Sequence, residues 1–363
     1  MVITHGTADR RSVMKKYIES ADGRFRYQVI LDFMQDMPEE YRMVPYMGNI
    51  ASGCTDRDGN IYCALRGGSF MSPRPLSCYI MLDPDGRFVR SFGQDAVTPT
   101  NHMGEVTPGG RTILSADYVK NCLVEVDMQT GGLVSTILPL GGADNVDRTA
   151  LWEFRMHKGV AATEPMHEPT FGGEPFQWYL AHKDEVMAPP FCNPTDVAFD
   201  SQGCLYVSDG YGNVAIHKYD RDRNYLKSWG GSGYDHYLDG VPTPGRFVTP
   251  HALTVDSRDH VWVCDRNKDA VHVFDTDGNL LYYRQGDMGQ PSGIDSNADY
   301  VYVCGRGGYL TIFDNDFNVV AELGEFNGDL RAHAVACDEA GNVYLFPTHA
   351  NTEHQVVALK AVR

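Results

Sequence analysis

The sequence predicts an all-β protein that folds as a six-bladed β-propeller. Short apolar segments that read as strands alternate with turns rich in Gly, Asp and Asn. The chain of 363 residues holds 37 glycines and 19 prolines, which favours many tight turns over long helices. A unit of roughly 40 residues with four short strands recurs along the chain, and such a unit is the sequence form of a propeller blade.

One position marks this repeat most clearly. A small or polar residue begins an apolar strand, and an aromatic residue follows eleven positions later in four copies: Ala51/Tyr62, Thr195/Tyr206, His251/Trp262 and His333/Tyr344. Two looser copies fit with a shift of about one residue, at His102 before Ile113 and at Ser292 before Tyr302. The six positions read Ala, His, Thr, His, Ser, His, so every second blade carries a histidine.

The blades are expected in chain order, and the last one completes the ring. Their expected ranges are about 50–93, 100–139, 193–230, 249–286, 290–324 and 331–363. The sixth blade lacks one strand, whereas Phe25–Leu31 reads as a strand without a blade. Pairing this N-terminal strand into the sixth blade closes the ring and removes exposed sheet edges. We therefore expect an arm at 1–24 and a single propeller domain at 25–363, with an insertion or lid at about 141–190, where the repeat pattern is lost.

Charge and composition exclude some partners. The net charge of −17 and the pI of about 5.1 argue against nucleic acid or an anionic membrane as a partner. No stretch approaches the roughly 18 apolar residues of a membrane span. Nine scattered cysteines without a C-x-x-C pair predict reduced thiols and a cytoplasmic location.

The alternating histidines predict a metal site on the propeller axis. Equivalent positions of six blades lie on a ring, so His102, His251 and His333 are expected about 120° apart, facing one another. Three imidazoles with an open fourth position suit zinc, and iron or manganese are alternatives. A single such histidine reads more readily as a hydrogen-bonded polar residue in a wet channel. The other histidines, which include His217 and His272, share no repeat position and are expected at the surface or rim.

Residues that follow the aromatic strand are expected at the mouth of the same channel. They are Arg66, Tyr211, Arg266 and Arg306. An arginine there could bind a substrate carboxylate through two hydrogen bonds, or could pair with an aspartate on the rim. Tyr211 could act as a base only beside cations that favour its phenolate form; otherwise it is an ordinary rim tyrosine.

Several segments closely resemble the peptidyl-α-hydroxyglycine α-amidating lyase family. They are Phe191–Ala198, Val207–Asn213, Ser228–Gly230, Pro244–Phe247, Pro250–Leu253 and Asp265–Asn267. The resemblance implies a zinc-dependent propeller of NHL-like repeats that splits a carbinolamide, an N-acyl-α-hydroxyglycine, into an amide and glyoxylate. It implies His102, His251 and His333 as zinc ligands, Tyr211 as the catalytic base, and Arg66 and Arg266 as partners of the substrate carboxylate or oxyanion.

The sequence departs from this family at three places near the site. Arg331 stands where the family has a methionine two residues before the last zinc ligand, which predicts a more negatively charged substrate or a different small acid. We therefore expect Arg331 and Arg306 to bind substrate. Ala334 replaces an aspartate of the family's structural calcium site, so calcium is not expected. Gly212 replaces a disulfide partner, which leaves Cys192 unpaired.

The leading hypothesis is therefore a zinc-dependent C–N lyase, similar to peptidylamidoglycolate lyase, that acts on a small carbinolamide or a related α-hydroxy acid. One alternative is a metal-dependent hydrolase or hydratase of a lactone, ester or small acid, in which metal-bound water attacks and no phenolate base is needed. The other is a non-catalytic NHL-type scaffold, which predicts that the protein binds no metal.

Overall fold

The structure is a computed structural model of the whole chain. It describes residues 17–41, 50–65, 77–98, 100–118, 120–138, 193–211, 214–231, 233, 242–325, 327–328, 330–347 and 355–362. Across these ranges the regular structure consists of short strands, joined by turns and by 3₁₀ turns such as η1 (Glu39–Tyr41) and η3 (Arg266–Lys268). No helix within them is long and apolar enough to cross a membrane.

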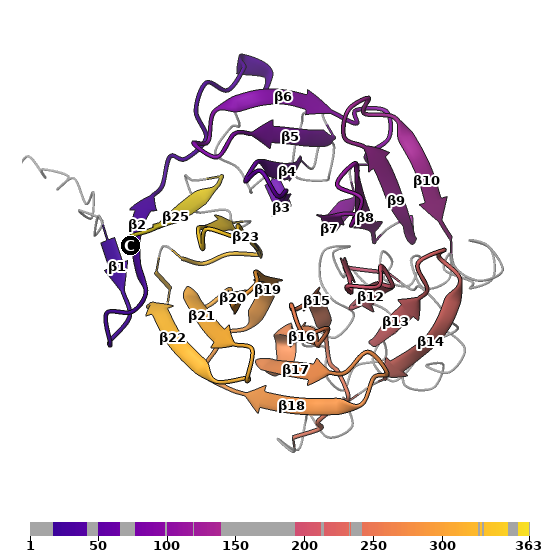
Figure 1. Ribbon diagram of the computed structural model, residues 1–363, viewed down its shortest axis with the longest axis vertical. Helices are drawn as coiled ribbons and strands as arrows, with labels where there is room; N and C mark the ends of the chain where they lie inside the picture. The colour runs from indigo at the N-terminus through magenta and orange to yellow at the C-terminus, as the bar shows by residue number, and fades with distance from the viewer. Residues whose placement is uncertain are drawn as a thin grey trace, which may run out of the picture.

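Six antiparallel sheets surround a central axis, which confirms the predicted six-bladed propeller (Figure 1). Each blade begins with its innermost strand, and the innermost strands β3, β7, β11, β15, β19 and β23 contact one another around the ring. Blade one consists of β3 (Ile50–Thr55), β4 (Ile61–Leu65), β5 (Cys78–Leu82) and β6 (Phe88–Phe92), and blade two of β7 (Asn101–Val106), β8 (Thr112–Asp117), β9 (Cys122–Asp127) and β10 (Leu133–Ile137). Blade three consists of β11 (Asp196–Phe199), β12 (Leu205–Asp209), β13 (Ala215–Tyr219) and β14 (Tyr225–Gly230), and blade four of β15 (Pro250–Val255), β16 (Val261–Asp265), β17 (Ala270–Phe274) and β18 (Leu280–Gln285). Blade five consists of β19 (Pro291–Ser296), β20 (Tyr300–Gly305), β21 (Tyr309–Asp314) and β22 (Val319–Gly324).

The sixth blade closes the ring with strands from both ends of the described chain. Its order is β1-β2-β25-β24-β23, with bounds β1 (Tyr17–Glu19), β2 (Arg26–Ile30), β23 (Ala334–Cys337), β24 (Val343–Phe346) and β25 (Val357–Ala361). The N-terminal strand β2 pairs with β25, as predicted, with Tyr27 opposite Ala361. Part of the expected N-terminal arm also joins the sheet: β1 pairs with the outer side of β2 and so covers an edge that would otherwise be exposed.

A repeated hydrogen bond fixes the first hairpin of most blades. The residue five positions after the ring position is Asp56, Asp200, Asp256 or Asp338 in four blades, and its carboxylate accepts backbone N–H bonds from the turn. The same carboxylate accepts a bond from the aromatic residue of the second strand. The Trp262 indole donates to Asp256 at 2.8 Å, for example, and the Tyr206 hydroxyl donates to Asp200 at 2.9 Å. The aromatic residue of the repeat therefore stabilises the turn as well as packing in the core.

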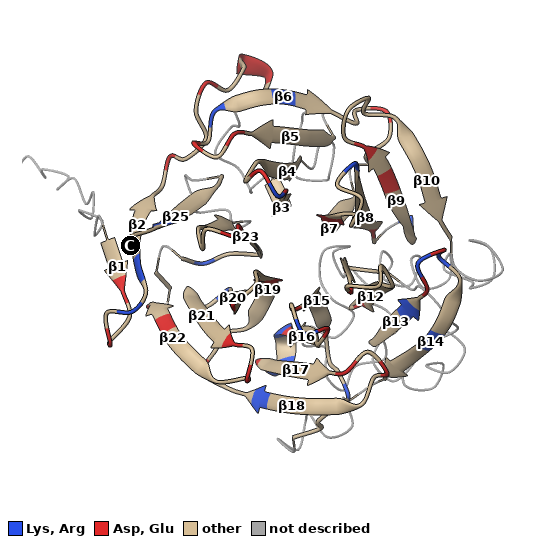
Figure 2. Ribbon diagram, viewed as in Figure 1, with Lys and Arg blue, Asp and Glu red and all other residues tan. Residues whose placement is uncertain are grey.

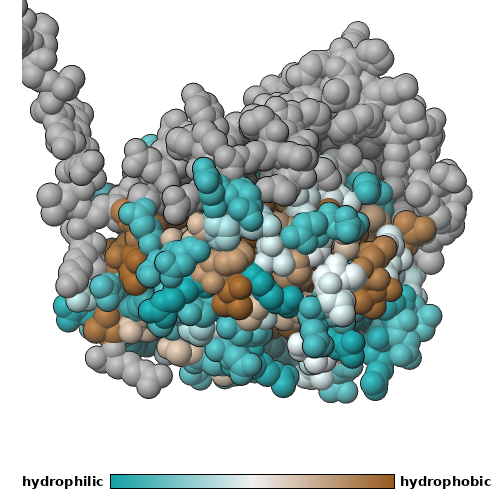
Figure 3. Space-filling view, turned by 90° about the horizontal axis from the view of Figure 1, so that it is seen from above, coloured by the Kyte–Doolittle hydropathy of each residue, from teal (hydrophilic) through white to brown (hydrophobic). Residues whose placement is uncertain are grey.

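The core lies between neighbouring blades, and this explains why apolar and polar residues do not alternate regularly along the strands. Middle strands such as β4 and β16 are buried at every position because sheets cover both of their faces. The outer strands β6, β10, β14 and β18 carry exposed apolar side chains, among them Val89, Leu133, Leu226 and Leu281. In a side view the described surface is mainly hydrophilic, with hydrophobic areas in separate patches (Figure 3).

Strand register decides which segments share a face of the ring. Pro250 at the start of β15 pairs with Asp265 at the end of β16, and Ala334 pairs with Phe346 in the sixth blade. Residues that precede an innermost strand therefore lie on the same face as residues that follow the second strand. The candidate site lies on this face.

Candidate metal centre

Three histidines converge on the axis of the propeller, as the repeat predicted. The ring centroids of His102, His251 and His333 are 5.0, 4.9 and 4.8 Å apart, which makes a nearly equilateral triangle. One ligand atom from each ring lies within 4.8 Å of the other two. The exposed fractions of the three side chains are 1%, 0% and 5%, so the cluster is almost fully removed from bulk water.

Each histidine is oriented by the blade that follows it around the ring. Nδ1 of His102 contacts the carbonyl oxygen of Thr195 at 2.7 Å, and Nδ1 of His251 contacts that of Ser292 at 2.6 Å. Nδ1 of His333 completes the pattern with the carbonyl oxygen of Ala51 at 2.8 Å. A carbonyl accepts only, so Nδ1 carries the proton in each ring and the lone pair is on Nε2. The carbonyl groups at the three equivalent positions that carry no histidine thus set the tautomer that a metal-binding histidine needs.

The chemistry of this cluster fits a divalent transition metal. Burial lowers the pKa of His251 well below its ordinary value, and nearby Arg266 and the other two histidines lower it further. Neutral imidazole is the form that binds metal.

Tyr211 lies against two of the three histidines. Its hydroxyl is 2.8 Å from Nε2 of His251 and 3.1 Å from Nε2 of His102. The preceding residue, Gly210, makes this approach possible, because a Cβ atom there would lie 2.4 Å from the carbonyl oxygen of Pro250. The hydroxyl predicted as a base therefore lies beside the atoms predicted as metal ligands.

Arg266 is a buried cation without a counter-ion among the residues that the structure describes. Its side chain is fully buried, and Nη1 lies 3.4 Å from the Tyr211 hydroxyl. Nε donates to Asn267, whereas Nη2 has no acceptor. A buried guanidinium with an unpaired N–H donor costs folding free energy unless an anion binds to it. Among the described residues, no carboxylate therefore compensates the charge of Arg266.

Tyr118 is a site residue that the sequence reasoning missed. Its ring packs edge-on against His102 at 5.6 Å and against Tyr211 at 5.7 Å between centroids. Asn193 donates to its carbonyl oxygen and ties this residue to the next blade. A signal was present in the sequence: Tyr118 directly follows its second strand, as Arg266 and Arg306 do in their blades.

The remaining predicted site residues lie at different distances from the cluster. Arg66 falls outside the described residues. Arg306 follows β20, and Arg331 lies two residues before His333, so both are on the face that carries Tyr211 and Arg266. Figure 2 shows basic residues in these regions, at the end of β16 and on the segment that leads into β23.

Two histidines expected at the rim are instead buried inside blades, so that expectation was wrong. Nε2 of His217 lies 3.1 Å from the Asp209 carboxylate, and Nε2 of His272 lies 3.7 Å from that of Asp265. They occupy the third position of β13 and of β17, a shared repeat position that was overlooked. The Asp209 carboxylate compensates the burial of Nε2 of His217, whereas Asp265 is too far from Nε2 of His272 for a hydrogen bond.

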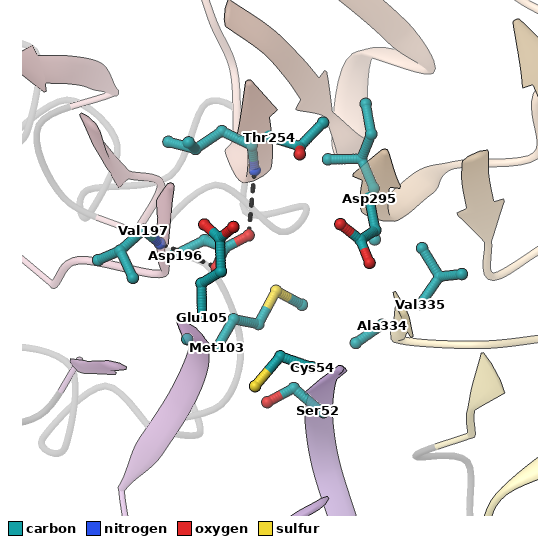
Figure 4. Close-up of a pocket in the computed structure, with 15 residues that line it drawn as sticks. Ser52, Cys54, Met103, Glu105, Asp196, Val197, Thr254, Asp295, Ala334 and Val335 are labelled. Atoms are coloured by element: carbon teal, nitrogen blue, oxygen red, sulfur yellow. Dashed lines mark hydrogen bonds between the residues drawn. The ribbon is translucent and has the colours of Figure 1, made fainter. Parts of the chain in front are cut away.

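An acidic cavity of about 40 Å³ lies along the innermost strands, among residues that follow the ring positions. Glu105, Asp196 and Asp295 line it and direct their carboxylates toward it (Figure 4). Burial raises the pKa of Glu105 and Asp196 well above the ordinary range and that of Asp295 to about 6. Asp196 also accepts the backbone N–H of Leu253, so it joins neighbouring blades. Sequence reasoning did not predict this cluster.

The fold and the cluster together define a class: a six-bladed propeller with a buried three-histidine centre that could hold a metal on its axis. No protein-family model matches the sequence. Sequence relatives nevertheless include amidating enzymes. A Xenopus laevis peptidyl-glycine α-amidating monooxygenase is 29% identical over 178 residues, 44% of this chain and 18% of that protein. Drosophila melanogaster peptidyl-α-hydroxyglycine α-amidating lyase 1 is 35% identical over 85 residues, 23% of this chain and 16% of that one.

An NHL-repeat protein is also among the relatives, and human NHL repeat-containing protein 3 is 31% identical over 87 residues, 24% of this chain and 23% of that protein. The matched parts span less than a quarter of these three relatives. The resemblance to amidating lyases and NHL-repeat proteins is confirmed, at modest identity.

Solved structures agree on the fold. A virginiamycin B lyase from Staphylococcus aureus superposes with a TM-score of 0.54 at 11% identity, over 93% of this chain and 100% of that one. A gluconolactonase from Xanthomonas campestris has a TM-score of 0.54 at 10% identity, over 93% and 90%. At such identities the likeness concerns the propeller alone.

Proposed function

We propose that this protein is a metal-dependent lyase that cleaves an N-substituted α-hydroxyglycine into glyoxylate and an amide. The observation that carries the proposal is the position of the Tyr211 hydroxyl. It lies within 3.1 Å of Nε2 of two histidines and 3.4 Å from Arg266, which has no counter-ion among described residues. The amidating enzymes among the sequence relatives support the same reaction class.

The histidines would hold a divalent ion, for which zinc is our choice. Such an ion supplies Lewis acidity toward the hydroxyl and carboxylate oxygens of the substrate. The carbonyl groups of Ala51, Thr195 and Ser292 hold the three rings in the required tautomer.

Tyr211 would act as the base. Its hydroxyl oxygen, which lies 3.4 Å from Nη1 of Arg266, would take the proton from the substrate hydroxyl. The O–H and C–N bonds then break while the C=O bond of glyoxylate forms, and the proton ends on the departing amide nitrogen. Atoms balance without any further reactant. Nη2 of Arg266, which lacks an acceptor, would bind the substrate carboxylate, and we assign the same kind of role to Arg66.

Glyoxylate release from N-acetyl-α-hydroxyglycine by zinc-loaded protein tests the proposal. Tyr211→Phe should lower kcat by about 10²–10⁴-fold, the usual contribution of a general base, while the zinc content stays the same. A hydrolase that attacks with metal-bound water would keep most of its activity toward lactones or esters after this substitution. No glyoxylate from the wild type, or full activity in Tyr211→Phe, would refute the lyase mechanism.

A further inference from the structure

Arg331 lies at the mouth of the metal centre, next to the turn that follows β20. It precedes His333 by two residues, and the backbone N–H of Ala332 donates to the carbonyl oxygen of Gly305 at 3.3 Å. Gly308 makes room for its stem: a Cβ atom there would lie 3.3 Å from Cγ of Arg331, and φ of +96° also favours glycine. The fold therefore holds the Arg331 side chain against the fifth blade on the substrate-facing side.

The charge of Arg331 is not compensated by any described residue. Its Nε atom is buried without an acceptor, and no described carboxylate lies within 4 Å of its guanidinium. Arginines elsewhere in this acidic chain do find partners. Arg258 pairs with Asp316 at 2.6 Å, and Arg284 pairs with Glu322 at 3.0 Å. Together with Arg266, the mouth thus presents two guanidinium groups for which the described residues supply no anion.

We infer that the substrate carries two anionic groups, and that Arg331 binds the one on the acyl side of the scissile C–N bond. This inference rests on the proposed function. Arg266 directly follows β16 of the fourth blade, whereas the Arg331 side chain packs against Gly308 of the fifth blade, so different blades hold the two guanidinium groups. A single carboxylate fits one guanidinium fork in a bidentate pair, so two forks held by different blades fit two acids. The substrate class is an N-acyl-α-hydroxyglycine whose acyl chain ends in a carboxylate.

Binding of uncleavable analogues tests this inference independently of turnover. N-succinylglycine carries the second carboxylate, N-acetylglycine lacks it, and neither has the hydroxyl group that the reaction consumes. Calorimetry on the zinc-loaded protein should show N-succinylglycine bound about tenfold more tightly or better, as expected for a charge-assisted pair. Arg331→Met should abolish this preference, so that the two analogues bind with similar affinity. The control Arg258→Gln, on the opposite rim, should behave as wild type.

Turnover of the two matching α-hydroxyglycines separates this inference from the proposed function. Faster glyoxylate release from the N-succinyl substrate, with the preference lost in Arg331→Met, supports both. Glyoxylate release without any preference between substrates, or a preference that survives in Arg331→Met, overturns the inference of a substrate with two anionic groups. The proposed lyase function would then still stand. A binding preference that depends on Arg331, without glyoxylate release from either compound, supports the second anion site while the lyase reaction fails.

Discussion

Nδ1 of His102 contacts the carbonyl oxygen of Thr195 at 2.7 Å, and these two residues occupy the same repeat position in adjacent blades. The same contact recurs from His251 to Ser292 and from His333 to Ala51. The six equivalent positions around the axis thus divide into three histidines and three residues that orient them. Because each contact joins neighbouring blades, the histidine cluster also links the blades around the axis.

Loss of one ligand should abolish stoichiometric metal binding. We expect His251→Ala to lower zinc affinity by more than the roughly 10–100-fold that changes to outer-shell partners cost. Elemental analysis of purified protein, with zinc titration against a chelator, measures the effect. His260→Gln is the matched control, because His260 lies in the far turn of the same blade beside Asp256. Equal zinc content in wild type and His251→Ala would contradict the assigned site.

Replacing Arg266 should weaken both substrate binding and proton transfer. Arg266→Met removes the cation beside Tyr211 and the unused Nη2 donor. We expect kcat/KM for glyoxylate release to fall by about 10²-fold or more, since a charged hydrogen bond to a buried partner is lost. The value of kcat should fall as well as KM rise, because Nη1 of Arg266 lies 3.4 Å from the Tyr211 hydroxyl that would take the proton. An unchanged kcat would show that Arg266 does not assist this proton transfer.

The half-buried carboxylate of Asp295, which lines the acidic cavity, should make the protein less stable at neutral pH. Its pKa is raised from 3.8 to about 6 by burial, so the folded state holds this proton more tightly than the unfolded state does. The stability contribution is therefore present below pH 4 and is lost as the pH rises through about 6. Asp295→Asn should raise the free energy of unfolding by about 1–3 kcal/mol at pH 7.5 and by little at pH 4.

Urea unfolding of wild type and Asp295→Asn at both pH values checks this prediction. Asparagine keeps an oxygen that can accept the backbone N–H of Cys337, which Asp295 accepts at 2.7 Å. A variant that is no more stable than wild type at pH 7.5 would contradict the assigned burial cost.

The hydrogen bond from the aromatic residue of the repeat to the aspartate of the turn should contribute measurably to stability. Trp262→Phe removes the indole donor to Asp256 and leaves space in a fully buried site, so we expect a loss of about 2–4 kcal/mol in unfolding free energy. The urea midpoint should fall with an unchanged m-value. Trp229→Phe is the control, since the indole N–H of Trp229 has no acceptor among the described residues. An equal loss in both variants would show that the hydrogen bond to Asp256 adds nothing.

The sequence by itself determined the blade count, the ring closure and the three histidines. This was possible because a propeller converts a repeat in sequence directly into a position on a ring, so equivalent residues such as His102 and His251 must face one axis. The turn chemistry around Asp256 and its aromatic partner is equally local, since both lie within one hairpin. Tyr118 could also have been found this way, from its place directly after a second strand.

Only the tertiary structure decided how side chains from different blades meet. The convergence of Glu105, Asp196 and Asp295 on one cavity depends on side-chain direction and on the register between innermost strands, neither of which the repeat specifies. That no described carboxylate pairs with Arg266 or Arg331 likewise follows from what surrounds each guanidinium in space. Contacts such as that of His333 with Ala51 join residues 282 positions apart, where sequence pattern carries no information on distance.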